Sequence, residues 1–369
     1  MECPMKVLHI IDNLSMGGAQ SLVKGIVEKQ PNNLDLYCYY LRRTSEPFTI
    51  EHVHASGFGG YSRFSFVPMF KLKGIILKNQ IEILHCHLFR SQVFGWLLKK
   101  LWFRDCKLIF HEHGQIVGSD NGNIVSIFLY RLFLKIAQNE VSRFIAISHA
   151  VRIKLEGLKL DSPVKVVYNF VDLEKFNLGK INSPNEAFRE FAKSKKESDF
   201  VVGYAGRLVK GKGWQEFLTS TFGLMIKHSN IHVLIAGGGP DKEEIVGLLR
   251  DKKNAHYCGQ VSDMRSYYQL LDCFVIPSHW EAMGLTRIEA AACGVPVIAS
   301  NVEGLNETVA DNTNGLLFEA GNQMDLAEKI ERLYYDVNLG QRLAEQAMID
   351  VKQYDFDVYL SHISEIYQE

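Results

Sequence analysis

Two glutamates, Glu281 and Glu289, stand eight residues apart in the stretch HWEAMGLTRIEAAACGVPVIAS at residues 279–300. Gly284 lies between them, and the residues after it favour a helix at about 285–293. The first turn of a helix presents unpaired N–H groups and the positive end of the helix dipole, so it can bind an anion. A carboxylate accepts hydrogen bonds from hydroxyl pairs, so the two glutamates could hold a sugar and a ribose. The alternative is a helix start with one glutamate favoured by the dipole and the other solvated.

A basic loop, GRLVKGKGW, follows an apolar run that ends near Gly206. Arg207 and Lys212 lie just past this predicted strand, and the glycines at 211 and 213 would let the backbone approach a ligand closely. Arginine offers a planar fork and lysine a point charge, which together suit a diphosphate. A basic turn before a helix is the alternative interpretation.

The composition is that of a globular chain long enough for two domains. The 369 residues include 47% apolar and 22% charged residues with a formal net charge of −1, which excludes a disordered or fibrous protein and gives no reason to expect nucleic acid as a partner. Residues 1–178 carry 22 Lys and Arg against 15 Asp and Glu, whereas the remainder carries 19 against 27. The basic half could favour anionic surfaces or phosphorylated substrates, or it could be an unevenly charged, solvated surface.

The cysteines and the apolar segments bear on the compartment. Seven cysteines, an odd number without C-x-x-C spacing, indicate reduced thiols in a cytosolic protein, and no signal peptide is evident. The longest apolar segment, 124–137, is interrupted by Arg131 and Lys135 and is shorter than the ~20 residues of a membrane span. The aromatic and basic stretch 58–80 could touch a membrane surface or a lipid diphosphate, or be an ordinary packed helix. We therefore expect a cytoplasmic protein that can be peripheral on the inner face of the membrane.

Short apolar runs alternate with helical stretches in two series, which predicts parallel sheets covered by helices on both faces. We predict two doubly wound, Rossmann-like α/β domains facing across a cleft, with ligands at the carboxyl ends of the strands. The polar segment between the two series predicts a linker. The predicted ranges are a first domain at 1–178, a linker at 179–198, a second domain at 199–352 and a C-terminal helix at 353–369 that can cross back to the first domain.

The motifs in their order resemble those of retaining glycosyltransferases with the GT-B fold, in the large family 4 with its E-x7-E signature, of the kind that assembles bacterial glycans. The second half carries GRLVKGKGWQEFL, HVLIAGGGPDKEEI, GQVSDM and CFVIPSHWEAMGLTRIEAAACGVPVIAS, followed by EGLNETVADNTNGLLFE. The first half carries MKVLHIIDNLSMGGAQSLV, EILHCHLFRS, FHEHG, FIAISHAV and VVYNFVDLEKF. The resemblance covers nearly the whole chain. It implies an acceptor-side first domain and a second domain that binds a nucleotide sugar.

The resemblance also implies roles for single residues. Arg207 and Lys212 would hold the donor diphosphate, Glu289 the ribose, and Glu281 the donor sugar. His113, in FHEHG, would lie near the transferred sugar, although by itself it would be taken for a structural histidine at a strand end. The implied catalytic residues are His113, Glu281, Arg207 and Lys212. The implied donor-binding residues are Gly17, Gly18, Arg207, Lys212, Met283, Gly284, Leu285 and Glu289.

The resemblance thus predicts a retaining hexosyltransferase. It would move a sugar from a UDP- or GDP-linked donor to a glycan or lipid-linked acceptor, in surface polysaccharide or glycoconjugate synthesis, without a metal or other cofactor. One alternative is a nucleotide-sugar epimerase or phosphorylase on the same scaffold. Another is a nonenzymatic module that binds a glycan or a protein partner. A nicotinamide dehydrogenase is disfavoured because the first loop lacks G-x-G-x-x-G and the second strand ends in Leu41-Arg42-Arg43, without an acid.

Three features depart from the pattern or compete with it. Phe170 stands where the family usually has glycine, so we expect a local change of backbone. His85 and His87 flank Cys86 on one face of a predicted strand, but two neighbouring residues without further ligands do not make a metal site. The D-x-D string at 355–357 lies far from any strand end, and we interpret it as chance.

Overall fold

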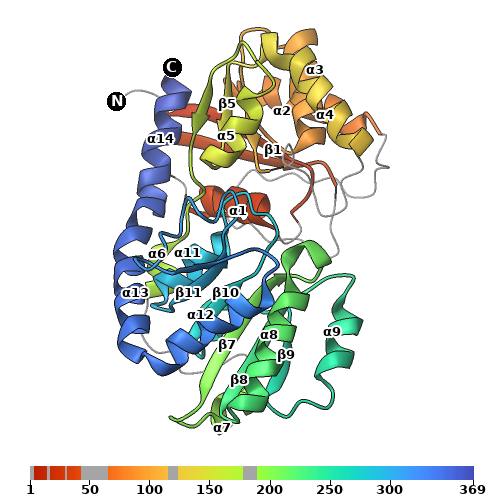
Figure 1. Ribbon diagram of the computed structural model, residues 1–369. Coiled ribbons are helices and arrows are strands. Elements are labelled where there is room, and N and C mark those ends of the chain that lie inside the picture. The colour runs from red at the N-terminus through yellow and green to blue at the C-terminus, as the bar shows by residue number, and fades with distance from the viewer. Residues whose placement is uncertain (1–3, 15–16, 30, 43–64, 115–123, 178–188) are drawn as a thin grey trace. The chain divides into compact units, whose positions relative to one another are not determined.

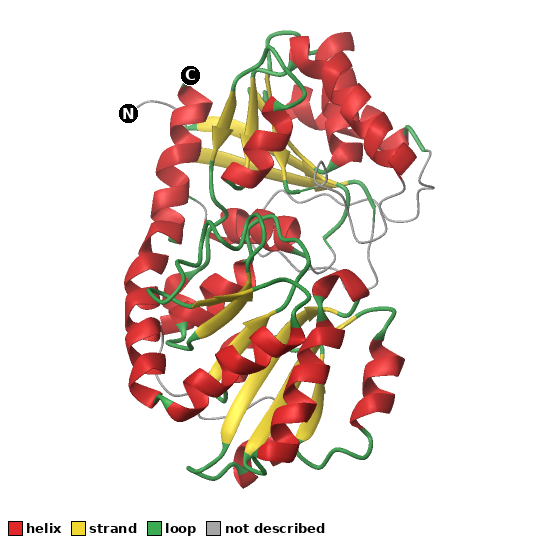
Figure 2. Cartoon of the chain, viewed as in Figure 1, coloured by secondary structure: helices red, strands yellow, loops and turns green. Residues whose placement is uncertain are grey.

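The computed structural model of the protein describes residues 4–14, 17–29, 31–42, 65–114, 124–177 and 189–369. The chain divides into two compact units, Met1–Phe170 with Asp357–Glu369, and Val171–Phe356. Each unit contains one sheet with helices around it (Figures 1 and 2). Within the described part of the chain, no helix is long and apolar enough to cross a bilayer.

The first unit is built on six parallel strands in the order β2-β1-β3-β4-β5-β6. The strands are β1 (Met5–Ile11), β2 (Leu34–Tyr40), β3 (Ile83–His87), β4 (Lys107–Glu112), β5 (Arg143–Ala146) and β6 (Val164–Val166). The helices are α1 (Gly18–Lys29), α2 (Val67–Asn79), α3 (Phe89–Leu101), α4 (Ile124–Ala137), α5 (His149–Glu156) and α14 (Phe356–Gln368), with a 3₁₀ turn η1 (Gln138–Glu140). The central strands are buried on both faces, as expected of a parallel sheet.

The second unit repeats this plan with the order β12-β11-β10-β7-β8-β9. Its strands are β7 (Phe200–Arg207), β8 (Ile231–Gly238), β9 (Ala255–Gly259), β10 (Cys273–Ile276), β11 (Val297–Ser300) and β12 (Leu316–Phe318). Its helices are α6 (Leu173–Asn177), α7 (Arg189–Ser194), α8 (Trp214–Lys227), α9 (Lys242–Leu249), α10 (Met264–Tyr268), α11 (Leu285–Ala292), α12 (Gln323–Tyr335) and α13 (Val337–Asp350), with 3₁₀ turns η3 (Lys210–Lys212) and η4 (Val351–Tyr354). These two six-stranded sheets confirm the predicted fold class of two doubly wound α/β domains.

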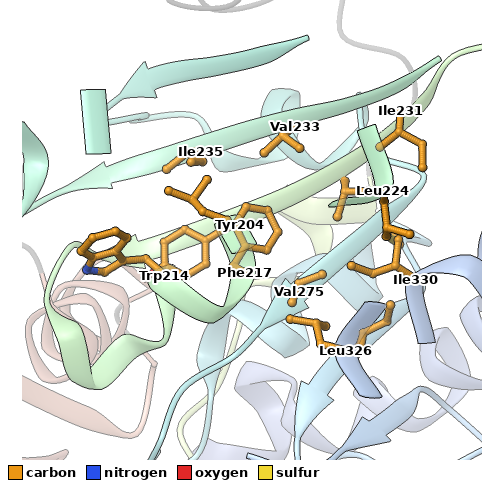
Figure 3. Close-up of a cluster of buried hydrophobic side chains, with 14 of the residues drawn as sticks. Tyr204, Trp214, Phe217, Leu224, Ile231, Val233, Ile235, Val275, Leu326 and Ile330 are labelled. Atoms are coloured by element: carbon orange, nitrogen blue, oxygen red, sulfur yellow. The ribbon is translucent and has the colours of Figure 1, made fainter. Parts of the chain in front are cut away.

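A large apolar core fixes the second sheet beneath its helices. Trp214 and Phe217 of α8 and Leu326 of α12 pack with Tyr204 of β7 and Val275 of β10 (Figure 3). All five side chains are 2% exposed or less. Burial of this kind stabilises by roughly 1.5–3 kcal/mol for each large side chain, so the strand ends that carry the candidate site residues rest on a well-packed core.

Each sheet has one point at which the chain reverses its direction of winding. In the first sheet the chain runs from β1 out to β2 and then returns to β3 on the other side of β1. In the second it runs from β7 through β8 to β9 and then returns to β10 on the other side of β7. Ligands of such sheets bind at the carboxyl ends of the strands next to this switch point.

The domain boundaries differ from those expected from composition. The second unit begins at Val171 and ends at Phe356, in place of 199–352, and residues 357–369 belong to the first unit. Residues 179–188 of the expected linker lie outside the described residues. The rest of that segment contains α7, whose Phe191 is buried against the rings of His232 and His256 at 5.4 and 5.0 Å. One buried aromatic thus anchors a polar segment that composition alone marks as a linker.

Candidate active site

The candidate site of the second unit lies at the switch point between β7 and β10. Arg207 is the last residue of β7, and η3 follows it with Lys212 at its end. The loop after β10 carries Glu281 and leads into α11. A backbone hydrogen bond from His279 N–H to the Gly211 carbonyl, 3.0 Å long, joins the two loops. The two motifs singled out in the sequence, 69 residues apart, therefore meet at one edge of the sheet.

Two glycines permit this close approach of backbones. Gly213 has a φ of 70°, and a Cβ there would lie 1.8 Å from the Pro277 carbonyl oxygen. Gly304 has a φ of 86°, and a Cβ there would lie 2.3 Å from the carbonyl oxygen of Glu281. Any side chain at either position would push the loop after β10 away. Gly213 belongs to the basic loop predicted from the sequence, whereas Gly304, in EGLNETV, carries no such signal by itself.

Lys212 and Glu281 form an ion pair inside this loop cluster. The Lys212 Nζ lies 2.7 Å from Glu281 Oε1, and the two side chains are only 14% and 20% exposed. The Ser278 hydroxyl donates to the same carboxylate oxygen at 3.0 Å. The Lys212 ammonium also lies 4.8 Å from the centre of the Trp280 ring. Lys212 is thereby held in one place by a carboxylate and an aromatic face. Ser278 and Trp280 stand beside Glu281 in the sequence, but only the structure shows that they contact the ion pair.

The start of α11 has no side-chain cap. Its N-cap is Gly284, in the left-handed region with a φ of 79°, and no side chain caps the helix. A Cβ on Gly284 would lie 2.5 Å from Leu305 Cδ2. Met283 is buried, whereas Leu285 is half-buried. The uncapped first turn leaves backbone N–H groups for a ligand.

Glu289 lies one turn inside α11, in a setting unlike that of Glu281. Its Oε2 accepts a hydrogen bond from the Tyr268 hydroxyl at 3.0 Å. Burial raises the pKa of Glu289 from 4.5 to about 7, with the Tyr268 hydroxyl and Lys175 opposing the rise. A ligand that donates further hydrogen bonds to this half-buried carboxylate would stabilise its charged form.

Arg207 lies exposed at the end of β7 and pairs in register with Gly238 of β8. The neighbouring Gly237 has a φ of 137°, and a Cβ there would lie 1.9 Å from the Gly206 carbonyl oxygen. A glycine is thus required at 237 because the ends of β7 and β8 pair closely there. Arg207 lies at this paired end, beside the switch point.

In the first unit, Gly17 and Gly18 stand at the start of α1, which follows β1 at that sheet's switch point. The Gly17 carbonyl accepts the Ser21 N–H at 2.9 Å and so closes the first helical turn. Both glycines are exposed. The preceding residues 15–16 lie outside the described residues.

His113 follows β4, also in the first unit. Its Nε2 lies 2.9 Å from Nδ1 of His87, and burial lowers the pKa of His113 to about 3. Its Nδ1 is buried and has no hydrogen-bond partner in the described part of the chain. The next residue, Gly114, donates its N–H to the buried carboxylate of Glu112 at 3.0 Å, which fixes the turn after His113. His113 is therefore a neutral imidazole with one ring nitrogen that has no partner in the described part of the chain.

The expectation that His85 and His87 lack further partners is wrong. His9 of β1 joins them, together with His111 of β4 and His113, which directly follows β4. Nitrogen atoms of His9, His85 and His87 lie within 4.8 Å of one another, and so do those of His87, His111 and His113. These trios have the residue type that zinc and similar ions prefer. Their closest nitrogen pairs, however, are 2.9–3.1 Å apart, which is hydrogen-bond distance.

The two other departures have local explanations. Phe170 is not among the described non-glycine residues with positive φ, so this position does not require a glycine. Its ring packs 5.1 Å from that of Tyr359. In the D-x-D string, the Asp355 side chain accepts the N–H of Phe356 at 2.8 Å, and Asp357 lies in the first turn of α14. These are the usual places for aspartate at a helix start.

Two parallel-sheet α/β domains of this kind form the GT-B fold. Residues 16–175 match the family described as Glycosyltransferase Family 4, and residues 186–349 match the family described as Glycosyl transferases group 1. The chain is therefore a glycosyltransferase with a family 4 domain followed by a group 1 domain.

Individual proteins are similar to this chain in sequence or in fold. The chain is 32% identical over 226 residues to the capsular polysaccharide biosynthesis glycosyltransferase CapM of Staphylococcus aureus, an alignment that spans 58% of each chain. It is 29% identical over 331 residues to N,N'-diacetylbacillosaminyl-diphospho-undecaprenol alpha-1,3-N-acetylgalactosaminyltransferase of Campylobacter jejuni, covering 83% of this chain and 84% of that one. The fold is similar to that of Anabaena HepE in complex with UDP, with a TM-score of 0.80 at 20% identity, covering 99% of this chain and all of that one.

Proposed function

We propose that the protein transfers a hexose-type sugar, with retention of anomeric configuration, from a nucleotide diphosphate-sugar to a glycan or lipid-linked acceptor. The observation that carries the proposal is that Arg207, Lys212 and the uncapped start of α11 all follow β7 or β10, the two strands at the switch point. Two cations and a helix N-terminus suit a diphosphate. The donor is UDP- or GDP-linked, and the product belongs to surface polysaccharide or another glycoconjugate.

Each side chain of the site then has a task. Arg207 and Lys212 bind the diphosphate, and the backbone of Met283, Gly284 and Leu285 surrounds the sugar and the phosphate. When the bond between the anomeric carbon and the diphosphate breaks, negative charge grows on the β-phosphate. Fixed positive groups stabilise that charge at no cost of reorganisation, which is commonly the largest catalytic contribution.

The two glutamates hold the two ends of the donor. Glu289 binds the ribose hydroxyls, and Glu281 binds the donor sugar. Glu281 accepts from both Lys212 and Ser278, and a carboxylate engaged in this way is a weak nucleophile. This supports attack of the acceptor on the same face within one oxocarbenium-like ion pair, without a covalent intermediate on the enzyme.

In the first unit, His113 acts on the transferred sugar through its available nitrogen, and the loop at Gly17 and Gly18 admits the donor. We further propose that transfer needs no metal ion. The positive charge of Arg207, of Lys212 and of the α11 start is of the kind that a divalent ion supplies in other transferases.

The related proteins support this assignment. Anabaena HepE, which has the same fold, has been solved with UDP and with UDP-glucose. CapM is named for capsular polysaccharide synthesis, and the Campylobacter enzyme is named for an acceptor linked to diphospho-undecaprenol. An acceptor carried by a lipid also supports work at the cytoplasmic face of a membrane, as a peripheral protein.

A donor screen tests the proposal. Nucleotide sugars with different bases and sugars are added singly, and thermal unfolding is followed. A true donor at about 100 times its dissociation constant adds roughly 2.7 kcal/mol to the free energy of unfolding. The hits are then incubated with glycan and lipid-linked acceptors, and the anomeric configuration of the product is read by NMR. Turnover that needs no acceptor, or that needs inorganic phosphate, would point to an epimerase or a phosphorylase and would refute the proposal.

A further inference from the structure

Helices α2, α3 and α4 of the first unit lie side by side (Figure 1). Aromatic rings join them. The ring centres of Phe66, at the start of α2, and Phe94 of α3 are 6.2 Å apart. Those of Phe133 of α4 and Phe89 of α3 are 5.4 Å apart. We call the outer surface of these three helices the α2–α4 face.

The charge on these helices has one sign. Their sequences, VPMFKLKGIILKN, FRSQVFGWLLKKL and IVSIFLYRLFLKIA, contain eight Lys and Arg and no Asp or Glu. The whole chain, by contrast, has 41 Lys and Arg against 42 Asp and Glu. The excess of basic residues in the first half thus falls largely on these three helices, although Arg90 pairs with Asp12 and Lys99 binds backbone carbonyls.

Large apolar side chains are exposed on the same helices. On α4, Phe128, Leu132 and Ile136 are 63%, 44% and 55% exposed. Their spacing of four residues places them on one side of the helix. On its other side, Tyr130 and Leu134 are buried. A helix of a globular protein normally turns polar residues outward, so α4 has an outer side of unusual character.

The outer side of α2 is similar. Phe70 and Leu77 are 62% and 61% exposed. Lys73 extends over the Trp102 ring, with its Nζ 4.4 Å from the ring centre. Lys100 of α3 lies in the same way over Trp96, at 4.9 Å. Aromatic rings with lysines beside them are typical of surfaces at the boundary of lipid and water.

We propose that the α2–α4 face docks on the surface of an anionic lipid bilayer. Exposed apolar groups enter the boundary of the headgroups while lysines and arginines pair with lipid phosphates. A protein partner fits less well, because lysine is depleted in protein interfaces. The proposal rests on the proposed function in one respect, since a lipid-linked acceptor would be met at this surface.

Flotation of the full-length protein with vesicles tests it. The vesicles contain phosphatidylcholine alone or with phosphatidylglycerol. The wild type is expected to float with the anionic vesicles, and replacing Phe128 and Leu132 together by serine is expected to abolish this. Serine in place of Ile226 and Val337, which are 86% and 65% exposed in the second unit, is the matched control and is expected to change nothing. Each of Lys78→Gln and Lys135→Gln is expected to weaken binding about fivefold.

Three results would overturn the proposal: a wild type that does not float, a control variant that fails to float like the Phe128 and Leu132 variant, or equal binding to neutral vesicles. If serine at Phe128 and Leu132 instead abolishes self-association measured by light scattering, the face is a protein interface and the proposal is wrong. Thermal shift by a nucleotide sugar is measured on the same variants. It is expected to persist, so failure of the donor assignment and failure of the lipid surface are told apart.

A second, independent observation concerns the buried histidines. Five imidazoles and one tyrosine form a continuous hydrogen-bonded chain in the first unit. The links are His113 Nε2 to His87 Nδ1 (2.9 Å), His87 Nε2 to His9 Nδ1 (3.0 Å), His9 Nε2 to the Tyr367 hydroxyl (3.5 Å), this hydroxyl to His85 Nδ1 (2.6 Å), and His85 Nε2 to His111 Nδ1 (3.1 Å). At the two ends, His113 Nδ1 and His111 Nε2 are buried without a partner in the described part of the chain.

The proton balance of this chain allows two states. Burial lowers the pKa of each of the five histidines, so each imidazole carries one proton. If every histidine is protonated at Nδ1, each link has one donor and one acceptor, with the Tyr367 hydroxyl donating to His9. If every histidine is protonated at Nε2, each link is again satisfied, with the hydroxyl donating to His85. Any mixture leaves a link with two donors, a link with two lone pairs, or the buried hydroxyl hydrogen of Tyr367 without an acceptor, which is costly.

We infer that these five histidines share one tautomer and change it together, with Tyr367 as the positioning residue that couples them. The common tautomer decides whether His113 Nδ1 presents a donor or an acceptor to the proposed sugar. Tyr367 comes from α14, so the C-terminal helix that belongs to this unit would serve to supply the coupling hydroxyl.

Nitrogen-15 NMR of the histidine rings tests the inference without any ligand, with signals assigned by single histidine substitutions. The wild type is expected to show the same tautomer at all five rings. Tyr367→Phe is expected to let His85 and His111 differ from the other three and to lower kcat about tenfold, the effect of one neutral hydrogen bond. Tyr359→Phe, on the same helix, removes a buried hydroxyl that has no partner among the described residues and serves as the control.

Mixed tautomers in the wild type, a doubly protonated ring among the five, or a stoichiometric metal ion bound by these nitrogens would each overturn the inference. So would a Tyr359→Phe variant that decouples the rings as Tyr367→Phe does. The tautomer readout does not depend on a donor, so it stands or fails separately from the proposed function.

Discussion

Lys212 Nζ lies 2.7 Å from Glu281 Oε1, so the cation assigned to the donor diphosphate is already paired with the carboxylate assigned to the donor sugar. Both side chains are mostly buried, and such a pair is held more firmly than a surface ion pair. An incoming diphosphate must share Lys212 with Glu281. The two residues therefore act as a coupled unit, and a change in one alters the charge that the other presents.

The first prediction follows for Glu281→Gln. Glu281 is assigned to the moiety that gains positive charge during transfer, so kcat is expected to fall, by one to two orders of magnitude for a lost charge-assisted bond of ~1.5–3 kcal/mol. Because Lys212 loses its competing anion, a free nucleoside diphosphate is expected to inhibit as well as before or better. Steady-state rates with inhibition constants measure both. Weaker inhibition by the nucleotide would show that Glu281 serves the nucleotide and not the sugar.

The second prediction concerns Glu289→Gln. Ribose does not react, so the loss of a charge-assisted bond, roughly 1.5–3 kcal/mol, is expected mainly in the KM for the donor, with kcat little changed. Inhibition by the free nucleoside diphosphate is expected to weaken in parallel. If donor KM and nucleotide inhibition are both unaltered, Glu289 is a buried helix residue without a role in binding.

The third prediction is the effect of the same substitution on stability. The pKa of Glu289 is about 7 in the folded chain against an ordinary 4.5. Between these values the folded chain binds a proton that the unfolded chain has lost, so this contribution to stability is complete at low pH and is lost as the pH rises through 7. Glu289→Gln is expected to be more stable than the wild type above that pH, by roughly 1–3 kcal/mol, and equal to it in acid. Urea unfolding across this pH range measures the difference, and a wild type that matches the variant at every pH would contradict the prediction.

The fourth prediction concerns Gly213→Ala. Its Cβ would lie 1.8 Å from the Pro277 carbonyl oxygen at a φ of 70°, so the loops at the switch point must move apart. We expect the free energy of unfolding to fall by several kcal/mol, because the clash and the backbone strain act together. Gly223→Ala, in the middle of α8 with nothing near its Cβ, is the control and is expected to stabilise by about 0.5–1 kcal/mol. Equal effects of the two substitutions in chemical unfolding would refute this role for Gly213.

The fifth prediction is that sugar transfer survives an excess of EDTA. Arg207, Lys212 and the α11 start supply the positive charge for the leaving diphosphate. The rate is measured before and after chelation, with added Mg²⁺ and Mn²⁺ as the control. A complete loss that either ion restores would show that the site needs a metal.

The strand ends and the helix starts could be predicted from the sequence because they depend on local patterns. The sequence predicts Arg207 just past a strand and Gly284 at the start of a helix. The structure has Arg207 as the last residue of β7 and Gly284 as the N-cap of α11. Apolar runs with β-branched residues define such strands, and a glycine before an alanine-rich run defines such a helix start. The short β12 was missed because three residues carry too little pattern.

Pairings between distant residues could not be predicted in the same way. The ion pair of Lys212 with Glu281 requires that β7 and β10 be neighbours, which is a property of strand order. The histidine chain likewise requires β1, β3 and β4 in that order and Tyr367 from the far end of the sequence. HCH and HEH were visible as strings, but their joining into one network depends on this topology.

The central claim is that the switch point between β7 and β10 binds a nucleotide diphosphate-sugar through Lys212 and its neighbours. The most direct measurement is calorimetric titration of the wild type and of Lys212→Met with the same nucleoside diphosphate. We expect binding by the wild type and a loss of roughly 1.5–3 kcal/mol in binding free energy for the variant, which removes a charged partner of the diphosphate. Failure of every nucleoside diphosphate and nucleotide sugar to bind the wild type, or equal affinity of the folded variant, would contradict the claim.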